Sequence, residues 1–396
     1  MGNPRFNEFA TYWSKQGHEI TVVAGAVDYR TGQKISQQRR KLVRRERYGE
    51  NITIVRCSFS RSYNKSFFHR FLSYVWFAFS STIGMLFYIG KHDIIIASSP
   101  PLSIIIPVYL INTIRRIPFI FEVRDLWPKF AVDLGILKNK LLIAIAEGME
   151  RTAYCTARAI IVASPAFTEY LVSEKKVPEH KITCIPNAVD FDNTLQATQN
   201  SAIRGKFGWG NKFVVLYTGS HGVAVDLWQL LDVAKIVNNP AILFVLIGDG
   251  MEKVQLMEAA KRENIHNIQF LDAVARDEIS AFINAADVCT ATLNPVFTTT
   301  YPNKVFDYMA CAKPIILPID GAARRLVIDQ ADAGIFVEPK NPQQFKTALV
   351  RLYNDPTLAK EYGLRGRAFV RDNYNRAELA KRYLKIIEHV CEKKNT

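Results

Sequence analysis

Residues 299–317 read TTYPNKVFDYMACAKPIIL and contain the loop, helix and strand around which the fold is organised. Pro302 and Asn303 open an amphipathic helix that we expect to run from Lys304 to about Cys311. A Lys-Pro step then ends the helix, and the apolar run PIIL follows as a buried strand. Helices that alternate with buried strands predict a parallel sheet with both faces covered.

The start of this helix is a candidate anion site. We expect Asn303 to be the N-cap, so that free backbone N–H groups and the positive end of the helix face a ligand. Lys304 adds a positive charge, and Asp307 lies one turn further along on the same side. These groups suit a nucleotide diphosphate, with phosphates on the N–H groups and the lysine and ribose hydroxyls on the carboxylate. An ordinary capped helix is the alternative.

The same alternation extends through both halves of the chain and predicts an α/β protein with two doubly wound, Rossmann-like domains. The predicted strands are 18–25, 51–57, 93–101, 118–123, 157–164 and 181–186 in the first half, and 213–219, 241–250, 267–271, 287–293, 314–317 and 333–338 in the second. The basic stretch up to about residue 50 lacks periodicity and is predicted to be a loop. Ligands bind at the carboxyl ends of such strands, and we expect the two edges to face each other across a cleft.

The domain boundary is predicted where the alternation breaks, around PNAVDFDNT and the polar run to Ser201. We expect an N-terminal domain over 1–186, a linker over 187–200, a C-terminal domain over 201–375, and a closing helix over 376–396 that packs back on the N-terminal domain. The opening MGNPRF reads as the turn after a first strand, so one strand with its turn, roughly 15 residues, is expected to be missing from the sequence.

The charge of the chain is concentrated in its first half. The net charge is +14, and residues 30–70 hold twelve Lys/Arg against Glu46 and Glu50. Such a tract predicts an acidic partner, either an anionic membrane, a nucleic acid or a phosphorylated substrate. Interleaved aromatics at Tyr63, Phe67, Phe68 and Phe71 could stack on bases, but no nucleic-acid module is recognisable, so no nucleic acid is expected.

Residues 72–90 carry no charge and are long enough to suggest a transmembrane helix. They also lie between two predicted strands of one sheet, which favours burial or docking at a membrane interface. The neighbouring basic tract favours attachment to an anionic bilayer.

No metal or disulfide site is predicted. The six cysteines are scattered without a CxxC, and the seven histidines show no HExxH, which indicates reduced, buried thiols in a cytoplasmic protein. Asp190 and Asp192 form a DxD, although an acid pair at a domain joint is more simply a turn cap. We therefore expect no metal and no other cofactor.

Two glycine turns end strands of the second half. GSHG supplies Gly219, Ser220, His221 and Gly222, and GDG supplies Gly248, Asp249 and Gly250. Glycines let the backbone approach a ligand closely, although plain strand–helix turns look the same. Neither a P-loop nor a GxGxxG is present, but three such loops, counting Pro302–Lys304, converge on one sheet edge.

In the first half, FEVRDLWPK (121–129) places charges at the end of a strand. Glu122, Arg124 and Asp125 are candidate site residues, since catalytic groups are often carried on such loops. A buried Asp–Arg pair that holds the loop is the alternative.

These segments together resemble the family 4 glycosyltransferases of the GT-B fold, in particular the bacterial cell-surface polysaccharide branch with fucosaminyltransferase-like enzymes. The resemblance rests on GNPRFNEFATYWSKQGHEITVVAG, DIIIASSPP, FEVRDLWP, IPNAVD, YTGSHGVA, VLIGDGMEK, PNKVFDYMACAKPII and AGIFVEP, which follow the family's order over essentially the whole chain. It implies transfer of a sugar from a nucleotide-sugar, usually without metal and with retention at the anomeric carbon. It also implies that the first strand is missing.

Carried over residue by residue, the resemblance assigns ribose binding to Asp307, whereas Thr299 replaces the family's first acid. Asn303 and Lys304 would then bind the diphosphate, together with the two glycine turns. The acceptor side would comprise Arg5, Ser99, Glu122, Arg124 and Asp125. Asp125 would orient the acceptor, and Lys304 would stabilise the charge of the leaving group.

The expected function is a retaining hexosyltransferase that uses a UDP-sugar and a polyprenyl-diphosphate-linked or saccharide acceptor in O-antigen or capsule synthesis. The expected location is the cytoplasmic face of the plasma membrane. A sugar-nucleotide epimerase of the same fold is an alternative, although Thr299 and Arg324 argue against it. A catalytically degenerate nucleotide-binding protein is another.

Overall fold

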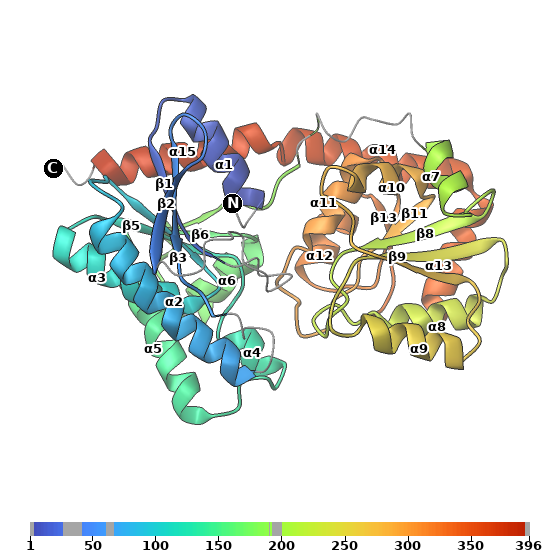
Figure 1. Cartoon of the computed structure of the whole chain (residues 1–396). Coiled ribbons are helices and arrows are strands. Elements are labelled where there is room, and N and C mark those ends of the chain that lie inside the picture. Colours follow the sequence, from blue (N-terminus) through green and yellow to red (C-terminus); the bar gives the residue numbers. More distant parts are fainter. Residues whose placement is uncertain (1–3, 27–41, 61–66, 190, 192–199, 393–396) are drawn as a thin grey trace. The chain divides into compact units, whose positions relative to one another are not determined.

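The computed structural model describes residues 4–26, 42–60, 67–189, 191 and 200–392. The chain forms two compact units, one of Met1–Pro186 with Ala377–Thr396 and the other of Asn187–Arg376. Each unit contains parallel β-structure flanked by helices (Figure 1), so the predicted α/β class with two Rossmann-like domains is confirmed.

Unit 1 contains two sheets instead of the one that the alternation predicts. The first has the order β1-β3-β2 and comprises β1 (Ile20–Gly25), β2 (Val43–Arg47) and β3 (Ile52–Cys57). The second is fully parallel in the order β4-β5-β6-β7 and comprises β4 (Ile95–Ser99), β5 (Phe119–Val123), β6 (Ala159–Val162) and β7 (Ile182–Cys184). The sheets are separate because β1 pairs only with β3, and β4 only with β5, among the strands described.

The prediction of a loop up to residue 50 is wrong for residues 43–47, because these form strand β2, which is antiparallel to β3. Val43 is buried and pairs with Cys57. This single apolar residue packs the strand, although the four charged residues after it make the segment look like a loop in the sequence. Arg56 is buried beside Glu46, at 3.4 Å between Nε and Oε2, so it is not available to an acidic partner. The remaining basic residues of 27–41 and 61–66 lie outside the described residues.

The helices of unit 1 cover these sheets. They are α1 (Pro4–Lys15), α2 (Phe67–Phe87), η1 (Leu102–Ile104), α3 (Ile105–Arg115), α4 (Lys129–Asp133), α5 (Lys140–Thr156), α6 (Pro165–Ser173), η2 (Glu179–Lys181) and α15 (Arg376–Glu392). An aromatic cluster joins α15 to α1, because the Trp13 indole N–H donates to the Ala380 carbonyl at 3.1 Å and the Phe9 and Tyr383 rings pack beside it. The C-terminal helix therefore belongs to unit 1.

Unit 2 holds one six-stranded parallel sheet in the order β10-β9-β8-β11-β12-β13. Its strands are β8 (Phe213–Thr218), β9 (Ile242–Ile247), β10 (Ile268–Leu271), β11 (Val288–Thr290), β12 (Ile315–Leu317) and β13 (Gly334–Phe336). Its helices are α7 (Asn200–Lys206), α8 (Trp228–Val237), α9 (Lys253–Arg262), α10 (Ile279–Ala285), α11 (Asn303–Ala310), α12 (Ala322–Arg324), η5 (Arg325–Gln330), α13 (Pro342–Asn354) and α14 (Pro356–Asn373).

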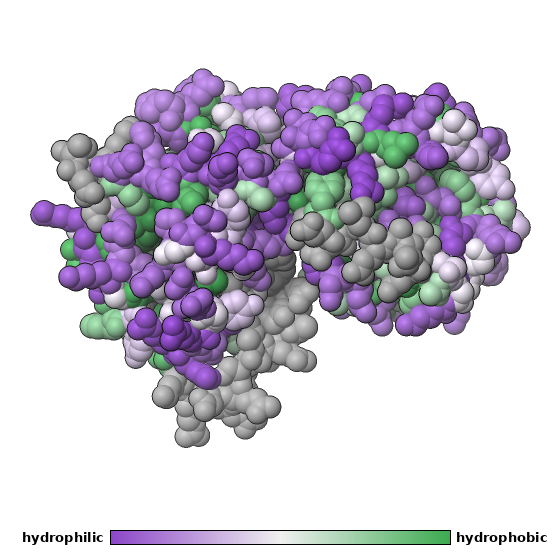
Figure 2. Space-filling model, turned by 90° about the horizontal axis from the view of Figure 1, so that it is seen from above, coloured by the Kyte–Doolittle hydropathy of each residue, from purple (hydrophilic) through white to green (hydrophobic). Residues whose placement is uncertain are grey.

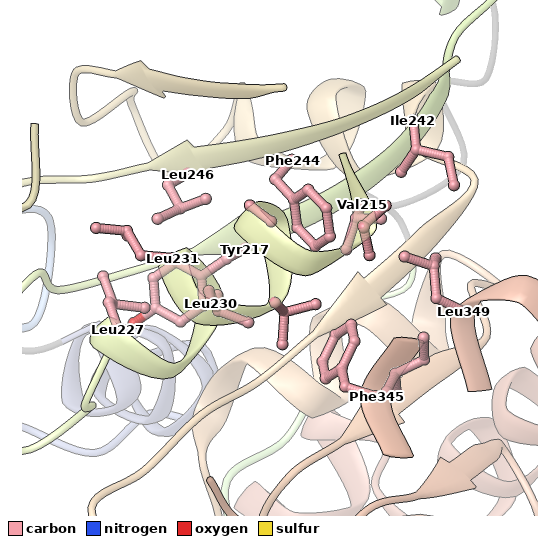
Figure 3. Packing of buried hydrophobic residues seen from close by; sticks show 14 of the residues in the cluster. Val215, Tyr217, Leu227, Leu230, Leu231, Ile242, Phe244, Leu246, Phe345 and Leu349 are labelled. Atoms are coloured by element: carbon pink, nitrogen blue, oxygen red, sulfur yellow. The ribbon is translucent and has the colours of Figure 1, made fainter. Parts of the chain in front are cut away.

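The core of unit 2 lies between its sheet and the helices α8 and α13 (Figure 3). Phe244 and Val215 from neighbouring strands pack against Phe345 and Leu349 of α13, and Leu230 of α8 joins them. All five side chains are buried, which is what the continuous apolar runs of these strands predict for a sheet covered on both faces. This core holds the strand ends of the candidate site in place.

The surface seen from above, over α1, α15 and α14, is largely hydrophilic (Figure 2). Among the residues that the structure describes, no helix combines the length and the apolar character that crossing a membrane requires. Of the six cysteines, Cys155 is exposed, which differs from the expectation of buried thiols, while Cys57, Cys289 and Cys311 are buried as predicted.

Candidate functional site

The candidate site of unit 2 lies where the strand order of its sheet reverses. From β8 the chain continues to β9 and β10 on one side of the sheet. From β11 it continues to β12 and β13 on the other side. The connections therefore leave the sheet in opposite directions at the carboxyl ends of β8 and β11, which is where doubly wound sheets bind ligands. The Gly219 turn and helix α11 follow these two strands in sequence.

The two glycine turns are packed backbone against backbone. The Gly219 N–H donates to the Ile247 carbonyl, and the His221 N–H to the Asp249 carbonyl, each at 2.9 Å. A Cβ on Gly248 would lie 1.8 Å from the Gly219 carbonyl oxygen, and one on Gly250 would lie 2.4 Å from the His221 carbonyl oxygen. Glycine is thus required at both positions because no side chain fits between the turns.

Lys253 connects the glycine turns to strand β10, and it was not among the residues predicted from the sequence. Its ammonium donates to the Gly248 carbonyl at 3.0 Å, the Leu271 carbonyl at 3.1 Å and the Asp272 carboxylate at 2.6 Å. The residue is buried although it is a lysine on the first turn of α9. Its position directly after the GDG turn was the available signal, since a lysine there can reach the turn's own carbonyls.

The prediction that Asn303 is an N-cap is wrong. Helix α11 begins at Asn303 itself, and the capping position is Pro302, which offers no side-chain hydrogen bond. The Asn303 side-chain oxygen instead accepts a hydrogen bond from the Asn187 amide. Pro302 takes the extended backbone conformation of a cap and stiffens the loop, and the N–H groups of the first helical turn lack intrahelical partners, as at any helix start.

Helix α11 is fixed to the end of β8 by Tyr308. The Tyr308 hydroxyl accepts from the Thr218 N–H at 2.8 Å and lies 3.1 Å from the Thr218 hydroxyl. Lys304 stands one turn earlier on the same helix, so this contact aims Lys304 at the Gly219 turn. Neither Tyr308 nor Thr218 was among the predicted site residues, because nothing in the sequence indicates that they meet.

Lys304 is a cation without an anion. Its Nζ lies 3.8 Å from the centroid of the Tyr217 ring, and its Cε and Nζ are each 3.1 Å from where a Cβ on Gly219 would stand. Burial of the ammonium lowers the pKa of Lys304 to about 7. The described residues offer it no ion pair, so the ring face alone stabilises its charge. An ammonium held in this way is ready to bind an anionic group.

Asp307 is already engaged by a cation. Arg276, in the segment between β10 and α10, makes a bidentate contact with its two carboxylate oxygens at 2.8 and 2.9 Å. The arginine side chain is largely exposed, whereas the aspartate is mostly covered. Arg276 was not predicted from the sequence, because a lone arginine in a loop carries no pattern.

His221 does not present its side chain to a donor, which corrects its place in the predicted donor set. The ring is fully buried against the rings of Tyr217 and Phe270, at centroid distances of 6.0 and 6.3 Å. Burial, together with the Lys253 and Lys304 cations, lowers the pKa of His221 to about 4, so the imidazole is neutral at pH 7. The backbone of His221 links the two glycine turns. Ser220 of the first turn and Asp249 of the second are exposed.

Among the predicted acceptor-side residues of unit 1, Arg5 and Glu122 form a buried ion pair. The Arg5 Nε lies 2.8 Å from Glu122 Oε1, and the same guanidinium donates to the Ile185 and Pro186 carbonyls at 2.6 and 2.5 Å. The sequence offered a buried Asp–Arg pair in the 121–129 loop as the alternative, whereas the buried ion pair that Glu122 forms is with Arg5. These two side chains hold α1, β5 and the end of β7 together.

The other three members lie at the ends of β4 and β5. The Arg124 N–H donates to the Ser99 carbonyl at 3.1 Å, and its guanidinium to the Pro100 carbonyl at 3.0 Å. Asp125 follows, and burial raises the pKa of its carboxyl to about 6, against the lowering effect of Arg124. The structure thus brings Ser99, Arg124 and Asp125 into one corner of unit 1.

The DxD of the sequence falls on Asp190 and Asp192, which lie outside the described residues. Within the described ranges, no three His, Cys, Asp or Glu side chains gather in a way that could hold a metal ion.

Two family profiles match the chain in succession. The profile described as Glycosyltransferase Family 4 matches residues 5–193, and the one described as Glycosyl transferases group 1 matches residues 212–355. The chain belongs to glycosyltransferase family 4 and is an enzyme of that class.

Relatives agree with this assignment. WcaI of Escherichia coli, whose name places it in colanic acid biosynthesis, is 22% identical over 376 residues, which are 90% of this chain and 90% of WcaI. Sucrose-phosphate synthase from Thermosynechococcus elongatus superposes with a TM-score of 0.77 at 15% identity, covering 97% of this chain and 92% of its own. Anabaena Alr3699/HepE, solved in complex with UDP, has a TM-score of 0.68 at 16% identity, covering 85% and 86%. These structures establish the GT-B fold.

Proposed function

We propose that the chain is a retaining glycosyltransferase that takes a sugar from a UDP-sugar and passes it to a polyprenyl-diphosphate-linked or saccharide acceptor in cell-surface polysaccharide synthesis. The observation that carries the proposal is the ammonium of Lys304, which stands at the switch point of unit 2 with an aromatic ring and a glycine beside it and no anion among the described residues. A diphosphate would supply that anion. The UDP in the HepE complex and the colanic acid assignment in the name of WcaI support the substrate class.

In this proposal the diphosphate lies on the Gly219 turn and on the first turn of α11. Gly219, Ser220 and Gly222 offer backbone approach, and the N–H groups that begin at Asn303 add the positive end of the helix dipole. Gly248, Asp249 and Gly250 support this turn from the neighbouring strand. Ribose hydroxyls would bind Asp307 once Arg276 releases it.

The proposed chemical step depends on stabilising the negative charge of the leaving diphosphate. As the glycosidic bond to the diphosphate breaks, negative charge grows on the leaving phosphate, and Lys304 with the N–H groups of the helix stabilises it. The acceptor hydroxyl attacks the anomeric carbon from the face that the leaving group vacates, and its proton passes to that phosphate. Asp125 of unit 1 would orient the acceptor. We place this reaction at the cytoplasmic face of the plasma membrane, where lipid-linked acceptors are held.

The test is a panel of UDP-, GDP- and dTDP-sugars offered with a polyprenyl-diphosphate acceptor, with nucleotide release and glycosylated lipid measured together. The proposal expects release that depends on the acceptor and is greatest with a UDP-sugar. An epimerase would change the sugar without an acceptor, and a degenerate nucleotide-binding protein would bind UDP but release nothing from any donor. Either result would refute the transferase.

A further inference from the structure

Helix α5 of unit 1 exposes an apolar strip along its outer side. Leu141 and Ile145, one turn apart, are 69% and 52% exposed. Ala144 and Gly148 lie on the same side of the helix and are exposed as well. We call these four residues the outer face of α5. An apolar helix face that is open to solvent on a folded protein marks an interaction site.

The opposite side of α5 is anchored in unit 1. The Tyr154 hydroxyl donates to the buried Glu150 carboxylate at 2.9 Å, and the Lys175 ammonium lies 2.7 Å from the other oxygen of that carboxylate. Tyr154 is itself buried, and the helix packs against α3. The helix is therefore held in one rotational setting, with its outer face directed to solvent.

Gly148 occupies the interior of this helix, where glycine is less favourable than alanine because its backbone loses more freedom on folding. A Cβ at this position would meet nothing within 4 Å, so packing among the described residues does not require a glycine here. A helix that carries no side chain at one point lets a second backbone come close at that point. The outer face thus has room for another chain at Gly148.

Charged side chains of alternating sign border the outer face along one edge. Lys140 and Glu147 lie about two helical turns apart and project from the same edge, and Arg151 follows one turn later. Lys140 and Glu147 are exposed, and neither forms an ion pair with another of the described residues. Such an edge favours a partner whose charges alternate in the opposite order, and an antiparallel copy of the same edge meets that condition.

A second copy of α5 that lies antiparallel across a two-fold axis satisfies the apolar and the charged groups together. In such a pair, every contact between two different residues occurs twice. With the axis beside Ile143, Lys140 faces the partner's Glu147, and Glu147 faces the partner's Lys140. Leu141 then packs beside the partner's Ile145, so the same arrangement covers the apolar strip.

We propose that the chain associates into a two-fold dimer through the outer face of α5. The two Lys140–Glu147 pairs fix the antiparallel direction. The two Leu141–Ile145 contacts remove the most exposed apolar side chains of the helix from water. The start of the partner's α5 lies over Gly148, where no side chain stands in its way. The proposal concerns association alone, so it goes beyond the proposed reaction and can fail or succeed separately from it.

The first experiment measures the association of the full chain by sedimentation velocity, without lipid or nucleotide, at concentrations up to about 100 μM. We expect a monomer–dimer equilibrium. Leu141→Ser/Ile145→Ser should raise the dissociation constant of the dimer at least about tenfold, because apolar side chains of both copies no longer leave water. The matched control, Val350→Ser/Leu364→Ser, changes two exposed apolar residues of unit 2 and should leave that constant unchanged. A chain that stays monomeric, or a dimer on which the two variants have equal effects, would overturn the proposal.

The second experiment tests the antiparallel register by charge reversal. Lys140→Glu brings two acids together at each pair, and Glu147→Lys brings two bases together, so each variant alone should associate at least about tenfold more weakly. An equimolar mixture of the two variants should recover the association, since a dimer of the unlike chains restores both opposite-charge pairs. The control is Lys212→Glu, at an exposed lysine of unit 2, which should associate like the unaltered chain. No recovery in the mixture would overturn the proposed pairing.

Thermal unfolding of dilute samples guards against loss of folding. The substituted side chains are exposed, so the melting temperature should stay unchanged, and a lower value in Leu141→Ser/Ile145→Ser would leave the mixture of charge variants to decide. A bilayer is the other surface that could cover the outer face. In that case the unaltered chain would sediment as a monomer, and Leu141→Ser/Ile145→Ser would weaken its cosedimentation with phosphatidylglycerol vesicles. That result would overturn the dimer.

Discussion

Each unit holds a cationic side chain near the carboxyl ends of a parallel sheet, Arg5 buried and Lys304 half-buried, and the two cations have opposite surroundings. Arg5 in unit 1 is saturated by the Glu122 carboxylate and two carbonyl groups. Lys304 in unit 2 faces the ring of Tyr217 and, within the part of the chain that the structure describes, forms no ion pair. A buried charge whose partners belong to the protein holds the fold together, whereas one without a partner is available to a ligand. The difference distinguishes a charge that is paired within the protein from one that, in the proposed function, binds the donor diphosphate.

The largest effect is expected from breaking the saturated pair. Arg5→Met should lower the free energy of unfolding by about 3–5 kcal/mol, because Glu122 is left buried without a counter-charge. Arg5→Met/Glu122→Met should recover much of this loss, since no charge then remains buried. Urea unfolding of the three proteins measures both effects. An unchanged midpoint in Arg5→Met would show that Arg5 is no more structural than Lys304.

Lys304→Met should have the opposite profile. Affinity for a UDP-sugar should fall about tenfold to a hundredfold, which corresponds to one charge-assisted hydrogen bond. The melting temperature should stay the same or rise, because the desolvated ammonium is gone. Titration calorimetry and thermal unfolding provide the two readouts. The control is Lys235→Met, an exposed lysine paired with Glu263, which should alter neither affinity nor function.

The acidity of Lys304 predicts a pH profile for donor binding. Its pKa is lowered to about 7 in the free protein, so the ammonium is mostly present below pH 7 and mostly lost above it. Binding of an anionic diphosphate then requires uptake of a proton, and the dissociation constant should rise by up to about tenfold per pH unit above 7. Lys304→Arg keeps its charge and should flatten this profile. A profile that is already flat in the unaltered chain would contradict the assignment.

Asp125 offers a test on the side of unit 1. Its pKa is raised to about 6 by burial, so the carboxylate forms as the pH rises through that value. If it orients the acceptor, kcat should rise between about pH 5 and 7, and Asp125→Asn should lower kcat by about tenfold with little change in donor KM. The same rise in Asp125→Asn would assign the pH dependence to another group.

The smallest effect is expected at Arg276. Its contact with Asp307 is largely exposed, so it contributes about 0.2–1 kcal/mol. Arg276→Gln frees the carboxylate and should tighten binding of a UDP-sugar by up to about fivefold. A 2′-deoxyribose donor should gain less, because Asp307 then has one hydroxyl fewer to bind. Equal gains with both donors would remove Asp307 from the ribose site.

The apolar runs and their alternation with helices were enough to predict the α/β class, and every strand of unit 2 lies within a predicted segment. Strand β2 was not predictable in the same way, since Val43 is its one buried residue and the other four are charged. Asn303 was misplaced by one position because Pro302 and Asn303 can both precede a helix, and only the backbone dihedrals decide between them. Element types follow from local periodicity, while boundaries depend on tertiary contacts.

The site was predictable to the extent that it is local in sequence. The two glycine turns and Lys304 follow from motifs of a few residues. Lys253 also contacts Leu271, 18 residues away, and Arg276 contacts Asp307, 31 residues away. The Tyr308–Thr218 contact spans 90 residues. The pairing of Arg5 with Glu122, 117 residues apart, is equally invisible in the sequence. Charges could thus be found from the sequence, but not their partners.

The interlocked glycine turns limit how the specificity of this enzyme can be engineered. A substitution at Gly248 or Gly250 would force the two turns apart, and one at Gly219 would strain a backbone with φ of +138° and crowd the end of the Lys304 side chain, so libraries at these positions should yield mostly inactive or unfolded clones. Ser220, Asp249 and Asn303 are exposed. Directed evolution toward a different sugar donor should therefore draw its useful substitutions from these three positions, on an unaltered glycine framework.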